Sequence, residues 1–376
     1  MLNKIAIMLL GLVIAGACSV ERIDAPLAQY SGIVLTPGDS GRVYFLDSSL
    51  TTITTLALGI RAQLGATISP DHRTLYLANV LPDDRHEFVA IDLVHRAIQW
   101  REPASGPNIS RPLNGMEVWA VDLLSITPDG SRLVTGVAIR DGIQGIATLD
   151  VATRTEARFA GPFVANGGIE PLPPSMRFPG GSLLLVGTRH PRDRSMAIYF
   201  LDPTTLAVQD SLTAVLNEVS DTLVQVLPVA GGEVLLLGGR RMIARYDLVS
   251  RRVTASVRKP TSGGFALNAD GRVLVLADQG QGPDSPGTGQ LTLFDAATLA
   301  PLGAITLPPV GGMPRRISNA SPSRNPAIIY VTTGARAPGI LFTPQPAELF
   351  SVDAITRTIV HERSLQDWGG AQAFWF

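Results

Sequence analysis

The 376-residue sequence contains one cysteine, Cys18, and two lysines, Lys4 and Lys259. A single cysteine excludes internal disulfides, so any folded domain must be held together by its core. Aromatic residues make up only 6% of the chain, and the formal net charge is −1. A nearly neutral chain lacks the field that draws proteins to nucleic acid, so we expect no nucleic-acid partner.

Catalytic and metal-binding motifs are also lacking. There is no His-x-x-x-His, Cys-x-x-Cys, Gly-x-Ser-x-Gly or P-loop pattern, and the five histidines are widely spaced. The glycine-rich segment 279–289 lacks the strand and helix that flank a phosphate-binding loop, so it is interpreted as a flexible loop. We therefore expect no metal and no cofactor, and a non-catalytic role is favoured over an enzyme.

The first residues, MLNKIAIMLLGLVIAGAC, have the organisation of a secretion signal. Lys4 precedes an apolar stretch that is too short to span a bilayer comfortably. The small residues 15–17 and Cys18 resemble the bacterial lipoprotein lipobox, with Ala15 where that family most often has Leu. The resemblance implies a signal peptide at 1–17 and a lipidated Cys18 with a short linker at 18–30. In that family, Asp after the cysteine is associated with retention at the inner membrane, so Ser19 implies the outer membrane. The alternative to a lipoprotein signal is an ordinary signal peptide that is cut nearby.

A repeated pattern fills the rest of the chain. Seven short apolar runs each end in aspartate, about 51 residues apart on average. Upstream of six of them lies another pair of runs joined by a tight turn, as in GATISPDHRTLYLAN (65–79) and FALNADGRVLVLAD (265–278). Turns such as Pro-Asp-Gly between apolar runs are hairpin signals. Each unit is therefore predicted to hold four strands, A to D, connected as a meander.

The two ends of the repeat array complement each other. Residues 31–58 supply runs for strands B, C and D only, and GGAQAFWF (369–376) supplies a single strand A. The sequence thus predicts an all-β, seven-bladed β-propeller of four-stranded antiparallel blades over residues 31–376, a single domain. The last blade combines strand A from the C-terminal end with strands B to D from the N-terminal end, which removes the open sheet edge.

The repeats resemble those of a known family. SPDHRTLYLAN followed by FVAIDLVHRAI, together with DVATRTEARF and DAITRTIVHE, is similar to the repeat of YVTN-type, WD40-like seven-bladed propellers. The resemblance covers nearly the whole chain after the signal, and it implies a fold rather than a function, because lactonases, electron-transfer subunits, surface-layer proteins and binding proteins share it. The Gly-His and Trp-Asp dipeptides of WD40 repeats and the Trp-bearing signature of quinoprotein propellers are absent.

The repeated aspartates are predicted to be structural. A carboxylate at the end of strand C can accept backbone N–H groups of the following turn, and a catalytic residue would occur once rather than in every blade. The turn aspartates are Asp47, Asp92, Asp150, Asp202, Asp247, Asp295 and Asp353.

The connections between strands differ on the two faces of the predicted ring. The A–B and C–D turns are short and form what we call the turn face. The B–C and D–A connections form the loop face, and they vary in length, with 81–87, 188–195 and 160–174 among them. Variable loops on a rigid scaffold are where binding usually resides. The candidate binding residues on this face are Asp83, Asp84, Arg85, His86, Arg140, Asp141, Arg189, His190, Arg192, Arg194, Arg240, Arg241 and Arg336.

Two interpretations of this arginine-rich face stay open. It is a recognition surface for an envelope protein or for a small anionic or carbohydrate-like ligand, or it is a solvated rim whose Arg and Asp side chains pair with each other. The sequence thus favours a lipid-anchored binding scaffold of the bacterial envelope, attached to the membrane only through its lipid. The alternatives are a lactonase-like hydrolase, for which Arg177 and Arg316 are the nearest inner-strand candidates, and a surface-layer-like structural component.

Overall fold

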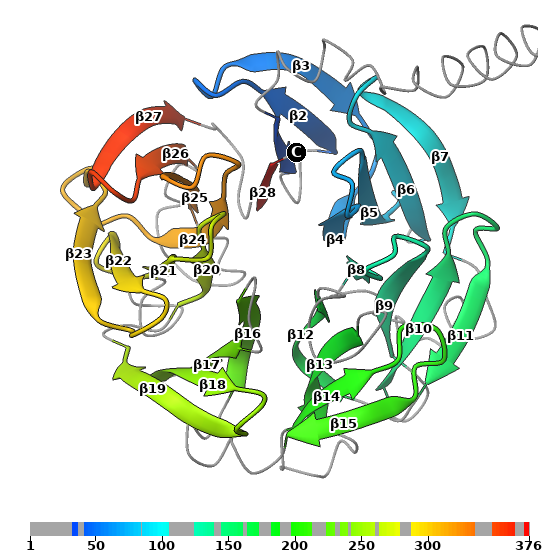
Figure 1. The fold of residues 1–376 in the computed structure, drawn as a ribbon. Helices are drawn as coiled ribbons and strands as arrows, with labels where there is room; N and C mark the ends of the chain where they lie inside the picture. Colours follow the sequence, from blue (N-terminus) through cyan, green and yellow to red (C-terminus); the bar gives the residue numbers. More distant parts are fainter. Residues whose placement is uncertain are drawn as a thin grey trace, which may run out of the picture.

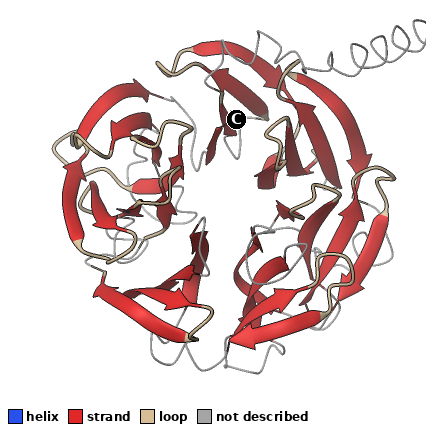
Figure 2. Ribbon diagram, in the orientation of Figure 1, coloured by secondary structure: helices blue, strands red, loops and turns tan. Residues whose placement is uncertain are grey.

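The computed structural model describes residues 32–36, 41–83, 85–104, 124–138, 144–160, 164–172, 182–188, 197–212, 223–229, 234–239, 242–259, 263–278, 287–334, 348–364 and 372–375. Within these residues the regular elements are all strands, and they form seven four-stranded antiparallel sheets. The sheets stand side by side around a central axis (Figures 1 and 2). The described part contains no helix, and so none long and apolar enough to cross a membrane.

The blades follow the chain order, with strand A innermost. Blade 2 consists of β4 (Ala62–Ile68), β5 (Thr74–Val80), β6 (His86–Asp92) and β7 (Ala97–Pro103). Blade 3 consists of β8 (Leu124–Ile126), β9 (Arg132–Ala138), β10 (Gln144–Asp150) and β11 (Glu156–Ala160). Blade 4 consists of β12 (Val164–Leu172), β13 (Ser182–Thr188), β14 (Ala197–Leu201) and β15 (Val208–Leu212).

The remaining complete blades repeat this order. Blade 5 consists of β16 (Leu223–Val229), β17 (Val234–Gly239), β18 (Met242–Asp247) and β19 (Arg252–Arg258). Blade 6 consists of β20 (Phe265–Leu267), β21 (Val273–Ala277), β22 (Gln290–Asp295) and β23 (Pro301–Thr306). Blade 7 consists of β24 (Ile317–Pro322), β25 (Ile328–Thr333), β26 (Glu348–Asp353) and β27 (Thr358–Ser364).

Blade 1 closes the ring and confirms the predicted exchange between the two ends of the chain. It consists of β1 (Ile33–Thr36), β2 (Arg42–Leu46), β3 (Thr52–Ala57) and β28 (Gln372–Trp375), in the order β28-β1-β2-β3. Strand β28 pairs antiparallel with β1, with Ile33 opposite Trp375. The innermost strand of blade 1 therefore comes from the other end of the chain.

Two predicted connections of blade 4 are wrong. The sequence indicated a long D–A loop over 160–174, but residues 164–172 form β12, the inner strand of this blade. The A–B connection between β12 and β13 therefore spans residues 173–181, which is longer than the short turn that was predicted. Its register shifts between Ala165 and Gly168, and Pro171 lies opposite Leu183. An inner strand has one free edge, so it tolerates a proline that lacks an N–H, and a bulge accommodates the glycine pair. Residues that normally break strands were thus compatible with this one.

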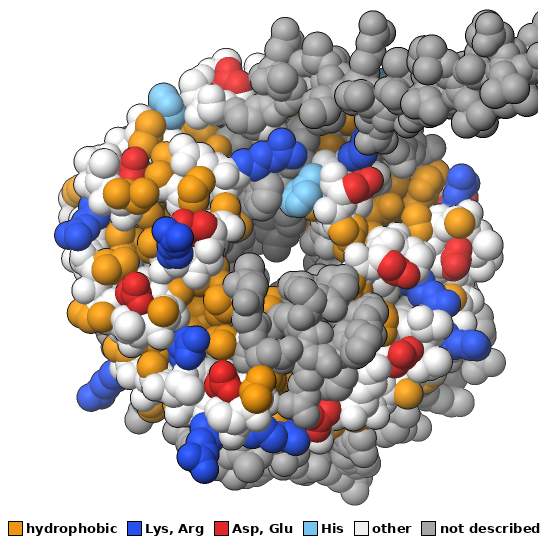
Figure 3. Space-filling model, viewed as in Figure 1, with side chains coloured by type: hydrophobic (Ala, Val, Ile, Leu, Met, Phe, Trp, Pro, Cys, Tyr) orange, Lys and Arg blue, Asp and Glu red, His pale blue; other side chains and the backbone are white. Residues whose placement is uncertain are grey.

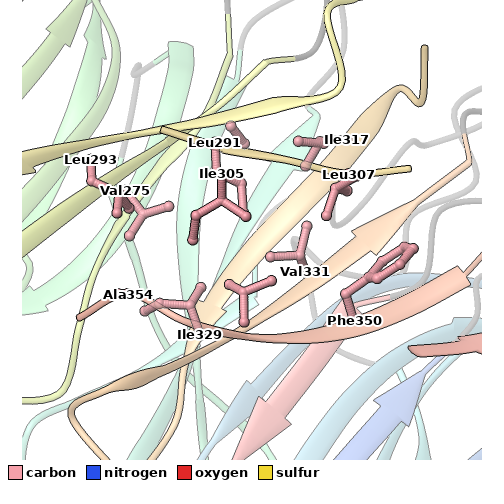
Figure 4. Close-up of a cluster of buried hydrophobic side chains, with 12 residues drawn as sticks. Val275, Leu291, Leu293, Ile305, Leu307, Ile317, Ile329, Val331, Phe350 and Ala354 are labelled. Carbon is pink, nitrogen blue, oxygen red and sulfur yellow. The ribbon is translucent and has the colours of Figure 1, made fainter. Parts of the chain in front are cut away.

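The core lies between blades rather than in one central cluster. Figure 4 shows the cluster between blades 6 and 7, in which Val275, Leu291 and Leu293 of blade 6 face Ile329, Val331 and Phe350 of blade 7. All of these side chains are fully buried. Burial of an aliphatic side chain of this size contributes about 1.5–3 kcal/mol, so each blade depends on its neighbours for stability. The space-filling view shows an opening at the centre of the ring (Figure 3).

Because β28 supplies the inner edge of blade 1, we expect a chain that lacks residues 372–376 to be strongly destabilised. The truncated protein should melt at least about 5 °C lower than the full chain in a circular dichroism experiment, since it loses both the ladder to β1 and the contact to β24. A synthetic GGAQAFWF peptide added in trans should restore part of this loss, and a scrambled peptide should not. An unchanged melting temperature would show that the ring does not depend on this strand.

Candidate functional site

The turn face is built from one hydrogen-bonding unit that recurs in every blade. Each aspartate at the C–D turn accepts at least one backbone N–H through Oδ1, at N···O distances of 2.7–3.1 Å. The Thr153 N–H lowers the pKa of Asp150, and the Ser250 N–H lowers that of Asp247. These carboxylates are occupied by their own turns, as an Asx-type turn requires.

A second feature of the same turns is a non-glycine residue in the left-handed region. It stands four positions after the aspartate in blades 2 to 7, with φ between 54° and 61°, and three positions after it in blade 1. The residues are Leu50, Arg96, Arg154, Leu206, Arg251, Leu299 and Arg357. The sequence analysis missed this position, although its restriction to Arg and Leu was visible in the repeat.

These left-handed residues connect neighbouring blades. The Arg154 Nη1 of blade 3 donates to Glu102 Oε1 of blade 2 at 3.0 Å, and its guanidinium lies 5.7 Å from the Trp100 ring centroid. Arg251 of blade 5 pairs with Asp210 of blade 4 at 3.1 Å. Leu206 is instead buried in a cluster with side chains of blade 3. These turn-face side chains therefore help to hold neighbouring blades together.

On the loop face, the structure describes three of the predicted binding residues. Asp83 and Arg85 form an exposed ion pair, with Oδ2 and Nε 2.7 Å apart, and Arg85 lowers the pKa of Asp83. His86 is half-buried as the first residue of β6. The other predicted residues lie outside the described part of the chain: Asp84, Arg140, Asp141, Arg189, His190, Arg192, Arg194, Arg240, Arg241 and Arg336.

Among the residues that the structure describes, buried charge is confined to the loop face. In the described residues the buried charged side chains are Glu87, Lys259, Asp278, Arg315 and Glu348, and each stands at a B–C or D–A connection. The sequence analysis placed Glu87 within the variable connection 81–87 but did not single out any of the five. The Thr288 N–H and Oγ1 both donate to Asp278 Oδ2, which ties together the two ends of the B–C connection of blade 6.

Glu87 is held from the outer strand of its own blade. Arg101 Nη2 lies 2.5 Å from Glu87 Oε1, and Arg101 Nε lies 3.0 Å from Oε2, a bidentate arrangement across blade 2. Asn79 Nδ2 approaches Oε1 at 3.4 Å from β5. The fork geometry of arginine suits a carboxylate in this way and fixes its orientation.

Arg315 organises the junction of blades 6 and 7. Its guanidinium forms ion pairs with Glu348 and with Glu362, the latter at 3.2 Å, and its Nε donates to the Pro308 carbonyl. It also lies 5.0 Å from the Phe350 ring centroid. Burial lowers the pKa of Arg315, and the charge of Glu362 opposes that effect. The carbonyl contact holds the base of a tight hairpin, Val310 to Met313, on the loop face.

Lys259 is the only lysine in the sequence besides Lys4, and it is 6% exposed. Its Nζ donates to the Gly239 carbonyl at 3.1 Å and to the Gly263 carbonyl at 2.7 Å. Burial lowers the pKa of Lys259 to about 8. The ammonium therefore links the end of β17 to the connection between blades 5 and 6.

Across the described residues there is no group of three or more His, Cys, Asp or Glu side chains that could hold a metal ion. Neither arginine predicted near an inner strand lies on one: Arg316 immediately precedes β24, and Arg177 falls between β12 and β13, outside the described part of the chain. On the face drawn in Figure 3, basic and acidic side chains are scattered singly around the ring, with hydrophobic atoms between them.

Comparisons with known proteins identify the fold. No family model matches the sequence, and no curated protein matches it. Among solved structures, the dihydro-heme d1 dehydrogenase NirN in complex with DHE aligns with a TM-score of 0.56 and 15% identity, over 95% of this chain and 78% of that chain. BamB from Moraxella catarrhalis aligns with a TM-score of 0.49 and 13% identity, over 90% of this chain and 86% of that chain. The chain is a β-propeller, and identities this low show nothing beyond the fold.

The difference in burial between Glu348 and Glu362 predicts unequal roles for these two carboxylate partners of Arg315. Glu348→Gln leaves the buried guanidinium without its buried counter-charge, so we expect a loss of about 3–5 kcal/mol in the free energy of unfolding. Glu362→Gln removes a partner that is 43% exposed, and the expected loss is under about 1 kcal/mol. Urea denaturation of both variants measures the difference. Equal losses would contradict the assignment of Glu348 as the main partner.

The buried Lys259 predicts a pH dependence of stability. Its folded pKa of about 8 lies below the ordinary value of 10.5, so the unfolded state binds more protons between these values. The free energy of unfolding should therefore rise with pH across this window, by at most about 3 kcal/mol, relative to Lys259→Met. In the 19–376 form Lys259 is the only lysine, so carbon NMR of its Cε reports the pKa directly. A midpoint near 10.5 would contradict the prediction.

Proposed function

We propose that the protein is a lipid-anchored β-propeller of the bacterial envelope, most simply at the outer membrane, that binds a partner through its loop face without catalysing a reaction. The partner class is an envelope protein or a small anionic or carbohydrate-like ligand. The anchor is the lipidated Cys18 implied by the lipobox resemblance. The YVTN-type repeat accounts for the scaffold on which the loops are mounted.

The proposal is supported by the buried charges, which in the described ranges all lie on the loop face. Asp278 ties together the two ends of the B–C connection of blade 6, and Arg315 holds the D–A connection before β24 through the Pro308 carbonyl. Glu87 joins β5, β6 and β7 beside the B–C connection of blade 2. Anchoring the base of a loop lowers the entropy that it loses on binding, which raises affinity. The turn face has the opposite character, because its carboxylates and arginines are occupied by contacts within and between blades. The loop face thus combines fixed bases with connections that differ in length.

Charge reversal on the two faces tests the proposal. Arg85 on the loop face and Arg272 on the turn face form a matched pair, because each follows an aspartate by two positions and pairs with it, at 2.7 Å and 3.9 Å. Their side chains are 69% and 84% exposed. Arg85→Glu should weaken partner capture about tenfold, and Arg272→Glu should leave it unchanged. Capture is measured by quantitative pull-down from a solubilised envelope fraction.

A second matched pair starts from exposed apolar side chains and introduces the same negative charge on each face. Met313, at the hairpin of the loop face, is 50% exposed, and Ile355, in the C–D turn of blade 7, is 68% exposed. Met313→Asp should reduce capture and Ile355→Asp should not. Loss of capture with Arg272→Glu and Ile355→Asp, but with neither loop-face variant, would assign binding to the turn face and overturn the proposal.

A further inference from the structure

The start of β1 and the end of β28, the two strands joined in the closing blade, both lie at the turn face. Ile33, the first residue of β1, is opposite Leu46, the last residue of β2, and Asp47 of the C–D turn follows directly. Trp375, the last residue of β28, is opposite Ile33. The chain that leads from Cys18 therefore reaches the propeller at the turn face, on the side away from the variable loops.

We propose that the turn face lies toward the membrane and that the loop face points away from it. This inference rests on the proposed lipid anchor at Cys18, and it adds the orientation of the ring and the compartment side from which a partner approaches. A partner that binds the loop face is then a protein domain or ligand in the aqueous space beyond the ring, because the ring itself separates that face from the lipid surface.

The dimensions of the tether favour this orientation. A seven-residue strand spans about 23 Å, which sets the distance between the two faces. Residues 19–32 reach about 50 Å only when fully extended. With the turn face toward the bilayer, the tether meets β1 directly. With the loop face toward the bilayer, the tether must run the height of a blade before it reaches lipid, and that extension costs chain entropy.

The surface of the turn face suits this position. Val249 and Ile355, each two positions after a turn aspartate, are the most exposed large hydrophobic side chains in the described residues, at 73% and 68%. The aspartates of the same turns, Asp247 and Asp353, direct their Oδ1 atoms to backbone N–H groups. Isolated apolar side chains of this kind are compatible with a bilayer interface, and the contact should not require anionic lipid.

Energy transfer on tethered vesicles tests the orientation. Cys18 is the only cysteine, so the 18–376 chain can be coupled through this thiol to a maleimide lipid in phosphatidylcholine vesicles that contain a rhodamine lipid. A donor dye is attached to a clickable amino acid at Ala297, in the C–D turn of blade 6, or at Met313, in the D–A connection that follows; both positions are exposed. The turn-face dye should transfer energy at least about twofold more efficiently, because the two faces are about 23 Å apart.

Equal transfer from the two positions, or more from Met313, would overturn the orientation. The 19–376 form, which lacks the thiol, gives the background for both dyes. Native lipidation is decided separately, by mass spectrometry of the N-terminal peptide from membranes of wild-type and Cys18→Ser cells. An unlipidated Cys18 would remove the proposed anchor, whereas equal transfer with a lipidated Cys18 would remove only the orientation.

Discussion

The pairing of β28 with β1 is the constraint on which the rest of the structure depends. It joins Ile33 to Trp375, across nearly the whole chain, and converts an open array of sheets into a ring. Closure over so long a loop costs entropy that grows only slowly with length, at about 0.6 kcal/mol per doubling, whereas it completes the packing of two blades at once. Strand β28 lies against β1 within its blade and against β24 of blade 7. The last strand of the chain thus supports the packing on both sides of the junction.

Elsewhere in the ring, residues of the C–D turns hold a blade against the blade before it. Leu206 and Leu299, two of the left-handed turn residues, are buried against the preceding blade. Arg154 and Arg251 occupy the same turn position, and each pairs with a carboxylate of the preceding blade. A non-glycine residue with positive φ costs about 1 kcal/mol, so it persists only where the surroundings compensate for it. Here the compensation is a contact that glycine could not make. In these four turns, backbone strain is therefore coupled to contacts between blades.

The sequence predicted what repeats and failed where a single blade departs from the repeat. Asp47 through Asp353 gave the blade number and the turn face, because one turn chemistry recurs at one spacing. The complementary ends gave blade 1. Strand β12 was missed because Gly168 and Pro171 normally break strands, and only the free edge of an inner strand accommodates them. The buried charges of the loop face were missed because Arg315 and Glu348 are brought together by the packing of separate segments, which no local pattern encodes.

This division explains why the two faces can serve different purposes. A turn face made of one repeated unit has little freedom to change, since Arg154 or Asp247 also holds neighbouring residues in place. The loop face is attached to the scaffold at Glu87, Lys259, Asp278 and Arg315, and each attachment is different. Connections between such fixed points can vary in length and composition without disturbing the blades beneath them. This difference supports the two proposals made above, that recognition falls to the loop face and that the tether meets the ring at the turn face, where β28 also closes it.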